Sequence, residues 1–166
     1  MTAPAPARSR RWSIPWAGEV QVVVDASPDH VFAVLTDVTR IAEWSHECRG
    51  AEWLDGATRA ELGATFRGSN QVNRFGWSRV CTVTTFEPGR SFGYRTSGGV
   101  PPDSTAWSFD LEPEGTGTRI VQRYEVIRFS RMLELITYAF VPAHRDRSGA
   151  LREDLVRLGI TAASGR

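Results

Sequence analysis

The feature that most constrains the fold is a run of six strand-like segments between residues 48 and 128, joined by short turn-forming stretches. The segments cover 48–54, 63–72, 76–87, 90–97, 104–113 and 117–128. The joints are rich in Gly, Pro and Asp, as turns require. Because parallel neighbours need long crossover connections, strands spaced this closely predict an antiparallel meander.

A further strand and two short helices precede the meander. The β-branched run over 19–25 predicts the first strand. The sequence Ser27-Pro28-Asp29 then predicts a helix start, since Ser can cap free N–H groups and Pro suits the first helical position. This helix has an apolar face at Val31, Leu35 and Val38. A second short helix is expected over about 39–44.

The last part of the chain is predicted to be helical. Apolar residues recur there every three or four positions, as in an amphipathic helix. The stripe comprises Leu133, Ile136, Phe140, His144, Ser148, Leu151, Leu155 and Leu158. Pro142 lacks an N–H group and its ring clashes with the preceding turn, which predicts a kink, or a break near Phe140 to Val141.

These elements predict an α+β domain: a seven-stranded curved antiparallel sheet wrapped around a long C-terminal helix, with two short helices after the first strand. The terminal helix is the one large element left to cover a face of the sheet. A strongly curved sheet that grips one helix tends to leave a gap beneath it. The sequence therefore predicts a cavity for a small apolar ligand.

The domain is expected to span 18–162, after a disordered or loosely packed arm over 1–17. Trp12, Ile14 and Trp16 alternate, so the end of the arm could lie along the domain and cover an apolar surface. The arm lacks the apolar stretch of a secretory signal, and no apolar run approaches the ~20 residues of a membrane span. A cytoplasmic location without an integral membrane segment is expected.

Charge and cysteine content narrow the expected partners. The net charge is +1, from 20 basic and 19 acidic residues, which argues against nucleic acid as a partner. Cys48 and Cys81 form no disulfide framework, and both are expected to be reduced, buried side chains. The protein is expected to be a monomer or a homodimer.

Short motifs distributed along the chain carry a family resemblance. They are Ala26–Phe32, Ile41–Ser45, Glu52–Gly56, Gly63–Gly68, Phe86–Arg90, Trp107–Phe109 and Gly117–Arg119. With them the chain over about 18–160 resembles the polyketide cyclase/dehydrase branch of the START-like (SRPBCC, helix-grip) superfamily. The resemblance implies binding, transport or sequestration of a small hydrophobic ligand, such as a lipid, a fatty acid or a polyketide-like molecule. The alternative that it implies is a polyketide cyclase, aromatase or dehydratase acting in the same cavity.

The cavity wall can be predicted from side-chain alternation along strands and the helical stripe. The expected ligand-binding residues are Trp44, Phe66, Asn70, Trp77, Cys81, Phe92, Tyr94, Trp107, Phe109, Gln122, Tyr124, Leu133, Ile136, Thr137, Phe140 and His144. Alternation does not tell which face is inward, so each apolar residue could instead belong to the core. Trp44 could stack on a ligand or wedge the short helices against the sheet.

Two residues are candidates for catalysis. His144, on the helical stripe, could serve as a general acid or base, or could bond a backbone carbonyl freed by Pro142. Tyr124 could donate a hydrogen bond to a ligand carbonyl. Glu47 and Arg49 are expected to form a surface ion pair of little energetic value.

Other kinds of chemistry find no support in the sequence. The three histidines offer no metal-ligand spacing, and the pair His46 and Cys48 lacks further ligands. Neither a phosphate-binding loop nor a Gly-x-Ser-x-Gly motif occurs. No metal and no cofactor are expected.

Overall fold

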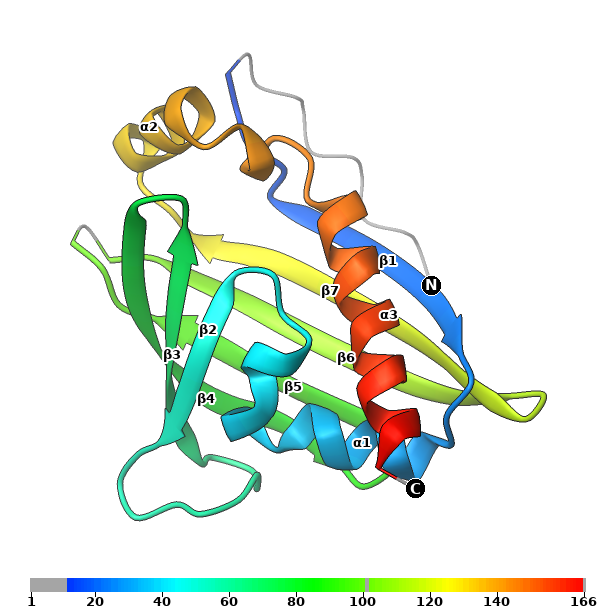
Figure 1. Ribbon diagram of the computed structural model, residues 1–166. Coiled ribbons are helices and arrows are strands. Elements are labelled where there is room, and N and C mark those ends of the chain that lie inside the picture. Colours follow the sequence, from blue (N-terminus) through cyan, green and yellow to red (C-terminus); the bar gives the residue numbers. More distant parts are fainter. Residues whose placement is uncertain (1–11, 101, 166) are drawn as a thin grey trace, which may run out of the picture.

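The structure is a computed structural model, which describes residues 12–100 and 102–165 (Figure 1). Its strands are β1 (Ala17–Val24), β2 (Cys48–Trp53), β3 (Thr65–Val72), β4 (Phe75–Glu87), β5 (Ser91–Ser97), β6 (Ser104–Glu114) and β7 (Gly117–Arg128). Its helices are α1 (Pro28–Thr36), the 3-10 helix η1 (Val38–Glu43), α2 (Arg131–Phe140), the 3-10 turn η2 (Pro142–His144) and α3 (Ser148–Ser164).

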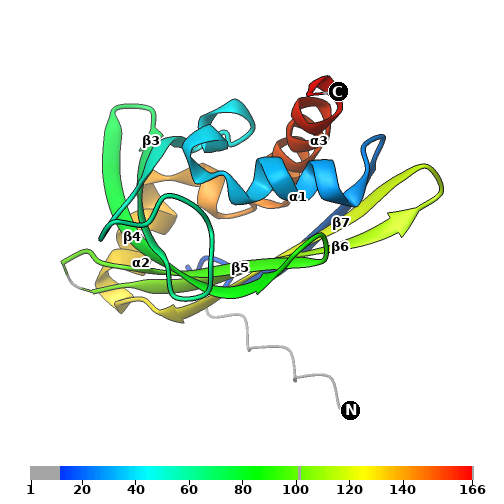
Figure 2. The ribbon, with the colours of Figure 1, turned by 90° about the horizontal axis from the view of Figure 1, so that it is seen from below.

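The strands form one antiparallel sheet in the order β1-β7-β6-β5-β4-β3-β2, so the predicted meander and all seven predicted strands are confirmed. Figure 2 shows the sheet curving upward at the end that holds β3 and β4, with α1 and α3 on its concave side. A register shift between Val83 and Thr85 interrupts the long β4–β5 ladder, and such bulges bend a strand and increase its twist.

The first helix begins as the sequence predicts. The Ser27 side chain accepts a hydrogen bond from the backbone N–H of His30 at 3.3 Å, and Pro28 occupies the first helical turn. The first turn of α1 therefore has fewer backbone N–H groups without a partner. The helix buries Val31, Phe32, Val34 and Leu35 against the sheet and α3.

The expected C-terminal helical stripe is divided between two helices. The predicted break after Phe140 is confirmed, because α2 ends there and Pro142 opens the η2 turn. Only α3 packs along β1 and α1, through buried Leu151, Leu155 and Leu158. In Figure 1, α2 instead lies at the far end of the sheet, beside the β3–β4 hairpin. The division leaves the concave face between α2 and α3 without a helix running through it.

The chain before β1 lies against α2. Ile14 is 5% exposed, and the carboxylate of Glu134 on α2 accepts hydrogen bonds from Ser13, from Trp16 Nε1 at 2.9 Å and from Arg131 at 2.9 Å. Ser13 and Trp16 are thus bound to α2, and the buried Ile14 between them agrees with the possibility that the end of the arm lies along the domain. Residues 1–11 of the arm lie outside the described residues. Within the described ranges, no helix is long and apolar enough to cross a membrane.

Candidate functional site

A cavity of about 690 Å³ lies between the concave face of the sheet, α2 and the segment that joins η1 to β2. Its volume falls in the range of small-molecule sites. Of the residues that the sequence predicted for its wall, those that line it are Trp44, Phe66, Asn70, Trp77, Cys81, Tyr94, Trp107, Phe109, Gln122, Leu133, Ile136, Thr137, Phe140 and His144. Their contact with a ligand stays a prediction.

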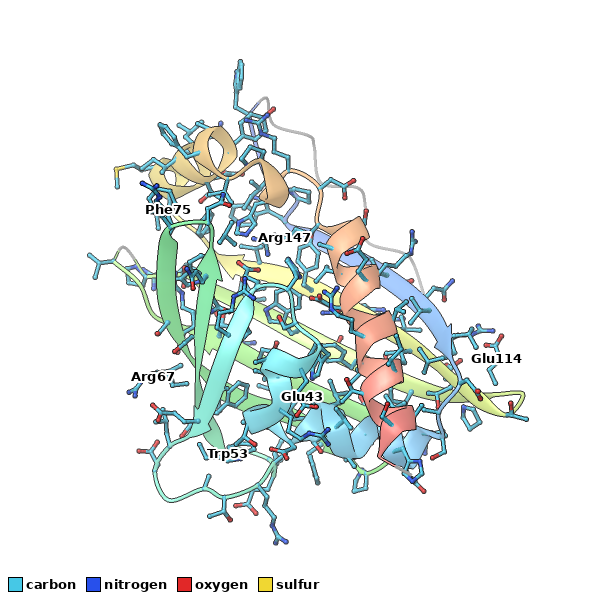
Figure 3. All side chains as sticks on the ribbon, viewed as in Figure 1. Glu43, Trp53, Arg67, Phe75, Glu114 and Arg147 are labelled. Carbon is cyan, nitrogen blue, oxygen red and sulfur yellow. The ribbon has the colours of Figure 1, made fainter. Side chains whose placement is uncertain are left out.

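The cavity has an exposed mouth and a buried end. At the mouth, Phe140 of α2 is 72% exposed and Phe75 at the β3–β4 turn is 66% exposed. Figure 3 shows Phe75 at the hairpin tip, next to α2. At the buried end, Phe66 and Phe109 are each 1% exposed, and both rings contact Tyr94. An apolar molecule that passed between α2 and the hairpin would meet an aromatic floor.

Phe92 was expected in the wall but lies outside it. It is fully buried and pairs across the ladder with Phe86, whose ring contacts Phe32 of α1 at 5.4 Å between centroids. Alternation along β5 correctly put Phe92 on the inner face. Its place along the strand puts it under α1, where the core is filled.

Tyr124 also lies outside the cavity wall, so the structure gives no support to its expected role as a hydrogen-bond donor there. Its ring covers Gly18, where a Cβ atom would come within 2.5 Å of Tyr124 Cε1. On its other sides lie the ring of Trp107, at 5.4 Å, and the guanidinium of Arg147, at 5.8 Å. Burial raises the pKa of Tyr124. The phenol of Tyr124 therefore stays protonated, and its ring packs against Trp107 outside the cavity wall.

His144 lines the cavity with both ring nitrogens engaged. Nε2 lies 3.2 Å from Glu47 Oε1, and Nδ1 lies 2.9 Å from a guanidinium nitrogen of Arg147. Since a guanidinium can only donate, Nδ1 accepts, and the proton of the neutral ring sits on Nε2, from which it is donated to Glu47. The expectation that His144 bonds a carbonyl freed by Pro142 is wrong. To exchange a proton with a ligand, the ring must release one partner.

Glu47 is turned toward His144 rather than forming the expected surface pair with Arg49. Burial acts to raise the pKa of Glu47, but the hydrogen bond from His144 and nearby positive charge, including that of Arg147, together hold it below its ordinary value. Glu47 is thus a carboxylate in the cavity wall. Figure 3 places Arg147 between α2 and α3.

A second polar cluster fixes the segment that carries this wall. Asp154 of α3, which is 3% exposed, accepts hydrogen bonds from the backbone N–H of His46 at 2.9 Å, from His46 Nδ1 at 2.7 Å and from Arg157. Arg157 also donates to the carbonyl of Trp44 at 3.0 Å. The hydrogen bond to Asp154 and the charge of that residue outweigh burial and raise the pKa of His46.

Sequence reasoning missed several polar residues of the wall, namely Glu47, Arg79, Asp103, Arg147 and Asp154. One signal was available: Asp154 stands three residues after Leu151 and four before Leu158, so the helical period places it on the buried stripe. The bidentate pair of Arg79 and Asp103, at 2.8 and 2.5 Å, joins β4 to the β5–β6 loop and had no such signal.

Burial favours the protonated form of both thiols in the wall. Cys48 and Cys81 are buried and free. Burial raises the pKa of Cys81 to about 12, so the thiol stays protonated and behaves as a small apolar side chain. Among the described residues, no three His, Cys, Asp or Glu side chains gather in a way that could hold a metal ion.

The fold is an α+β domain with a cavity on the concave face of its sheet, and the comparisons with known proteins place it in a family. The family model described as polyketide cyclase / dehydrase and lipid transport matches residues 15–157. The chain belongs to this family, which confirms the resemblance seen in the sequence. A search of curated proteins gave no match.

Solved structures share the whole helix-grip architecture. Protein MLL2253 from Mesorhizobium loti is 16% identical, with 90% of this chain and 98% of that chain covered and a TM-score of 0.65. Protein TTHA0849 from Thermus thermophilus is 12% identical, with 90% of this chain and 98% of that chain covered and a TM-score of 0.70. The di-domain ARO/CYC StfQ from the steffimycin biosynthetic pathway is 12% identical, with 94% of this chain and 53% of that chain covered and a TM-score of 0.70. At these identities the likeness shows the fold.

Proposed function

We propose that the protein binds a small hydrophobic molecule in this cavity and carries or sequesters it. The observation that carries the proposal is the cavity itself, about 690 Å³ of space lined mainly by aromatic and aliphatic side chains. Protein interiors are close-packed, and unfilled apolar space costs stability. A cavity of this size is best explained by a ligand that fills it and contributes its own apolar surface to the packing.

The exposed apolar side chains at the cavity mouth also support the binding of a hydrophobic molecule. Met132, Leu135, Ile136 and Phe140 of α2 are exposed apolar side chains, and α2 is joined to the rest of the domain by a Pro-containing turn. The helix is attached chiefly through the contacts of Glu134 and of the η2 turn. Movement of α2 away from Phe75 would open a path for an apolar ligand.

Native mass spectrometry of the purified protein, followed by extraction, tests the proposal. A matched pair of variants on α2 makes the test specific: Thr137→Trp fills part of the cavity, whereas Ala139→Trp adds the same ring on the exposed side. We expect a co-purified or added acyl or aromatic ligand to be lost from Thr137→Trp and kept by Ala139→Trp. Equal binding by both variants would contradict the proposal.

A second candidate is cyclisation, aromatisation or dehydration of a polyketide in the same cavity. It is favoured by the imidazole of His144 and the carboxylate of Glu47, which meet in the wall and could move a proton. The family description and the name ARO/CYC of the similar protein StfQ are consistent with it. We expect His144→Ala to leave ligand affinity nearly unchanged. A large loss of turnover of a poly-β-ketone in that variant would favour the enzyme over the carrier.

A further inference from the structure

We propose that the buried end of the cavity recognises a neutral hydroxyl group on an otherwise apolar ligand, an inference that rests on the proposed ligand-binding function. Two polar atoms carry it. Within the described part of the chain, Trp44 Nε1 and Gln122 Oε1 are buried and have no hydrogen-bond partner. Both side chains line the cavity, with exposed fractions of 5% for Trp44 and 4% for Gln122.

The two side chains border the same buried ring. The ring centroids of Trp44 and Phe109 are 6.3 Å apart in an edge-to-face contact. Phe109 on β6 is the direct partner of Gln122 on β7, so their side chains share the inner face of the sheet. The unpartnered atoms therefore belong to the floor around Phe109, away from Phe75 and Phe140 at the mouth.

Unpartnered buried polar atoms are costly, because the hydrogen bonds that they lose to water are not replaced. Phe in place of Trp44 and Leu in place of Gln122 would fill similar space without this cost. Their presence at the floor of an otherwise apolar cavity indicates that a bound molecule supplies the missing partners.

The chemistry of the two atoms selects the partner. The indole N–H only donates, and the amide oxygen only accepts. A hydroxyl group both accepts and donates while remaining uncharged, whereas a hydrocarbon does neither and a carboxylate has no proton for Gln122 Oε1. The two arginines of the wall are hydrogen-bonded to other residues, Arg79 to Asp103 and Arg147 to His144. Neither is therefore placed to neutralise a ligand carboxylate at the buried end of the cavity. The favoured ligand class is an apolar alcohol or phenol.

Three probes of similar shape test the inference: naphthalene, 2-naphthol and 2-naphthoate, each displacing the neutral fluorescent probe 1-aminoanthracene from the full-length protein. We expect 2-naphthol to bind about tenfold more tightly than naphthalene, as one buried hydrogen bond to the added hydroxyl allows. We expect 2-naphthoate to bind no better than naphthalene.

Substitutions at Trp44 and Gln122 test whether these two side chains cause the preference for 2-naphthol over naphthalene. Gln122→Leu and Trp44→Phe should reduce the ratio of the affinities for 2-naphthol and naphthalene toward one, and a cooperative thermal unfolding transition reports that each variant is folded. Gln21→Leu, on the exposed side of β1, makes the same change away from the cavity and should keep the preference.

The outcomes separate the two proposals. Equal affinity of the wild-type protein for naphthalene and 2-naphthol would overturn the hydroxyl site and leave the ligand-binding function standing. An unchanged preference in Gln122→Leu and Trp44→Phe, or tightest binding of 2-naphthoate, would also overturn the hydroxyl site. Failure of all three probes to displace the dye would contradict the ligand-binding function itself.

Discussion

Nδ1 of His46 lies 2.7 Å from Oδ2 of Asp154, so a side chain of the terminal helix holds the segment that brings Trp44 and Glu47 into the cavity wall. The same carboxylate accepts the backbone N–H of His46, and Arg157 links it to the carbonyl of Trp44. Asp154 thus couples the stability of the domain to the shape of the cavity.

Replacing Asp154 with Ala should destabilise the protein by about 2 kcal/mol, because a buried carboxylate that accepts several hydrogen bonds from a cation and from backbone is removed. Denaturant unfolding measures this change. The neighbouring Glu153→Ala is the control, since Glu153 is a 76% exposed side chain in a surface ion pair and should cost less than about 0.5 kcal/mol. Equal effects of the two substitutions would contradict the role of Asp154.

The pair of His46 and Asp154 should make stability depend on pH. Because folding raises the pKa of His46, its contribution is fully present below the ordinary value of 6.5 and is lost as pH rises through the folded-state pKa. The difference in Tm between the wild-type protein and His46→Gln should therefore be largest in mildly acid buffer and should shrink toward alkaline pH. A difference that grows with pH would refute this sign.

Glu134 should hold α2 and the segment over 13–16 together above acid pH. Burial acts to raise the pKa of Glu134, but its hydrogen bonds with Ser13, Trp16 and Arg131 keep it below the ordinary value of 4.5. Its contribution is therefore present above that value and is lost as pH falls through the folded-state pKa. In Glu134→Ala, hydrogen exchange should speed up in α2 and stay slow in α3. Uniform acceleration would instead indicate global destabilisation.

A pair of glycines in α3 tests the contact between this helix and β1. A Cβ atom at Gly159 would lie 2.5 Å from Val24 Cβ, whereas one at Gly149 would meet nothing within 4 Å. We expect Gly159→Ala to destabilise by about 1–3 kcal/mol through overpacking. Gly149→Ala should be neutral or stabilise by up to about 1 kcal/mol. Thermal unfolding distinguishes them, and equal stability of both variants would rule out the close approach.

Much of the fold was predictable because turn residues and strand-length apolar runs are local signals. The break at Pro142 followed from the missing N–H of one residue. Alternation then grouped the residues that share one face of each strand, and most of the residues grouped in this way line the cavity. It could not tell what covers each position along a strand: Phe92 lies under α1, whereas Tyr124 packs against Gly18, Trp107 and Arg147.

The polar part of the wall could not be predicted in the same way. Its pairs join residues far apart in the sequence: His144 and Glu47 are separated by 97 positions, and His46 and Asp154 by 108. No local pattern encodes such a pairing. The partners of His144 depended on where the η1–β2 segment and α3 come together in space.

We propose that the space on the concave face, between the sheet and α2, accepts an apolar molecule. Intermolecular NOEs between naphthalene and the labelled protein test it most directly. We expect contacts from naphthalene protons to the rings of Phe66, Tyr94 and Phe109. Saturable binding without such contacts, or with contacts confined to the exposed side chains of α2, would show that the cavity is not the site.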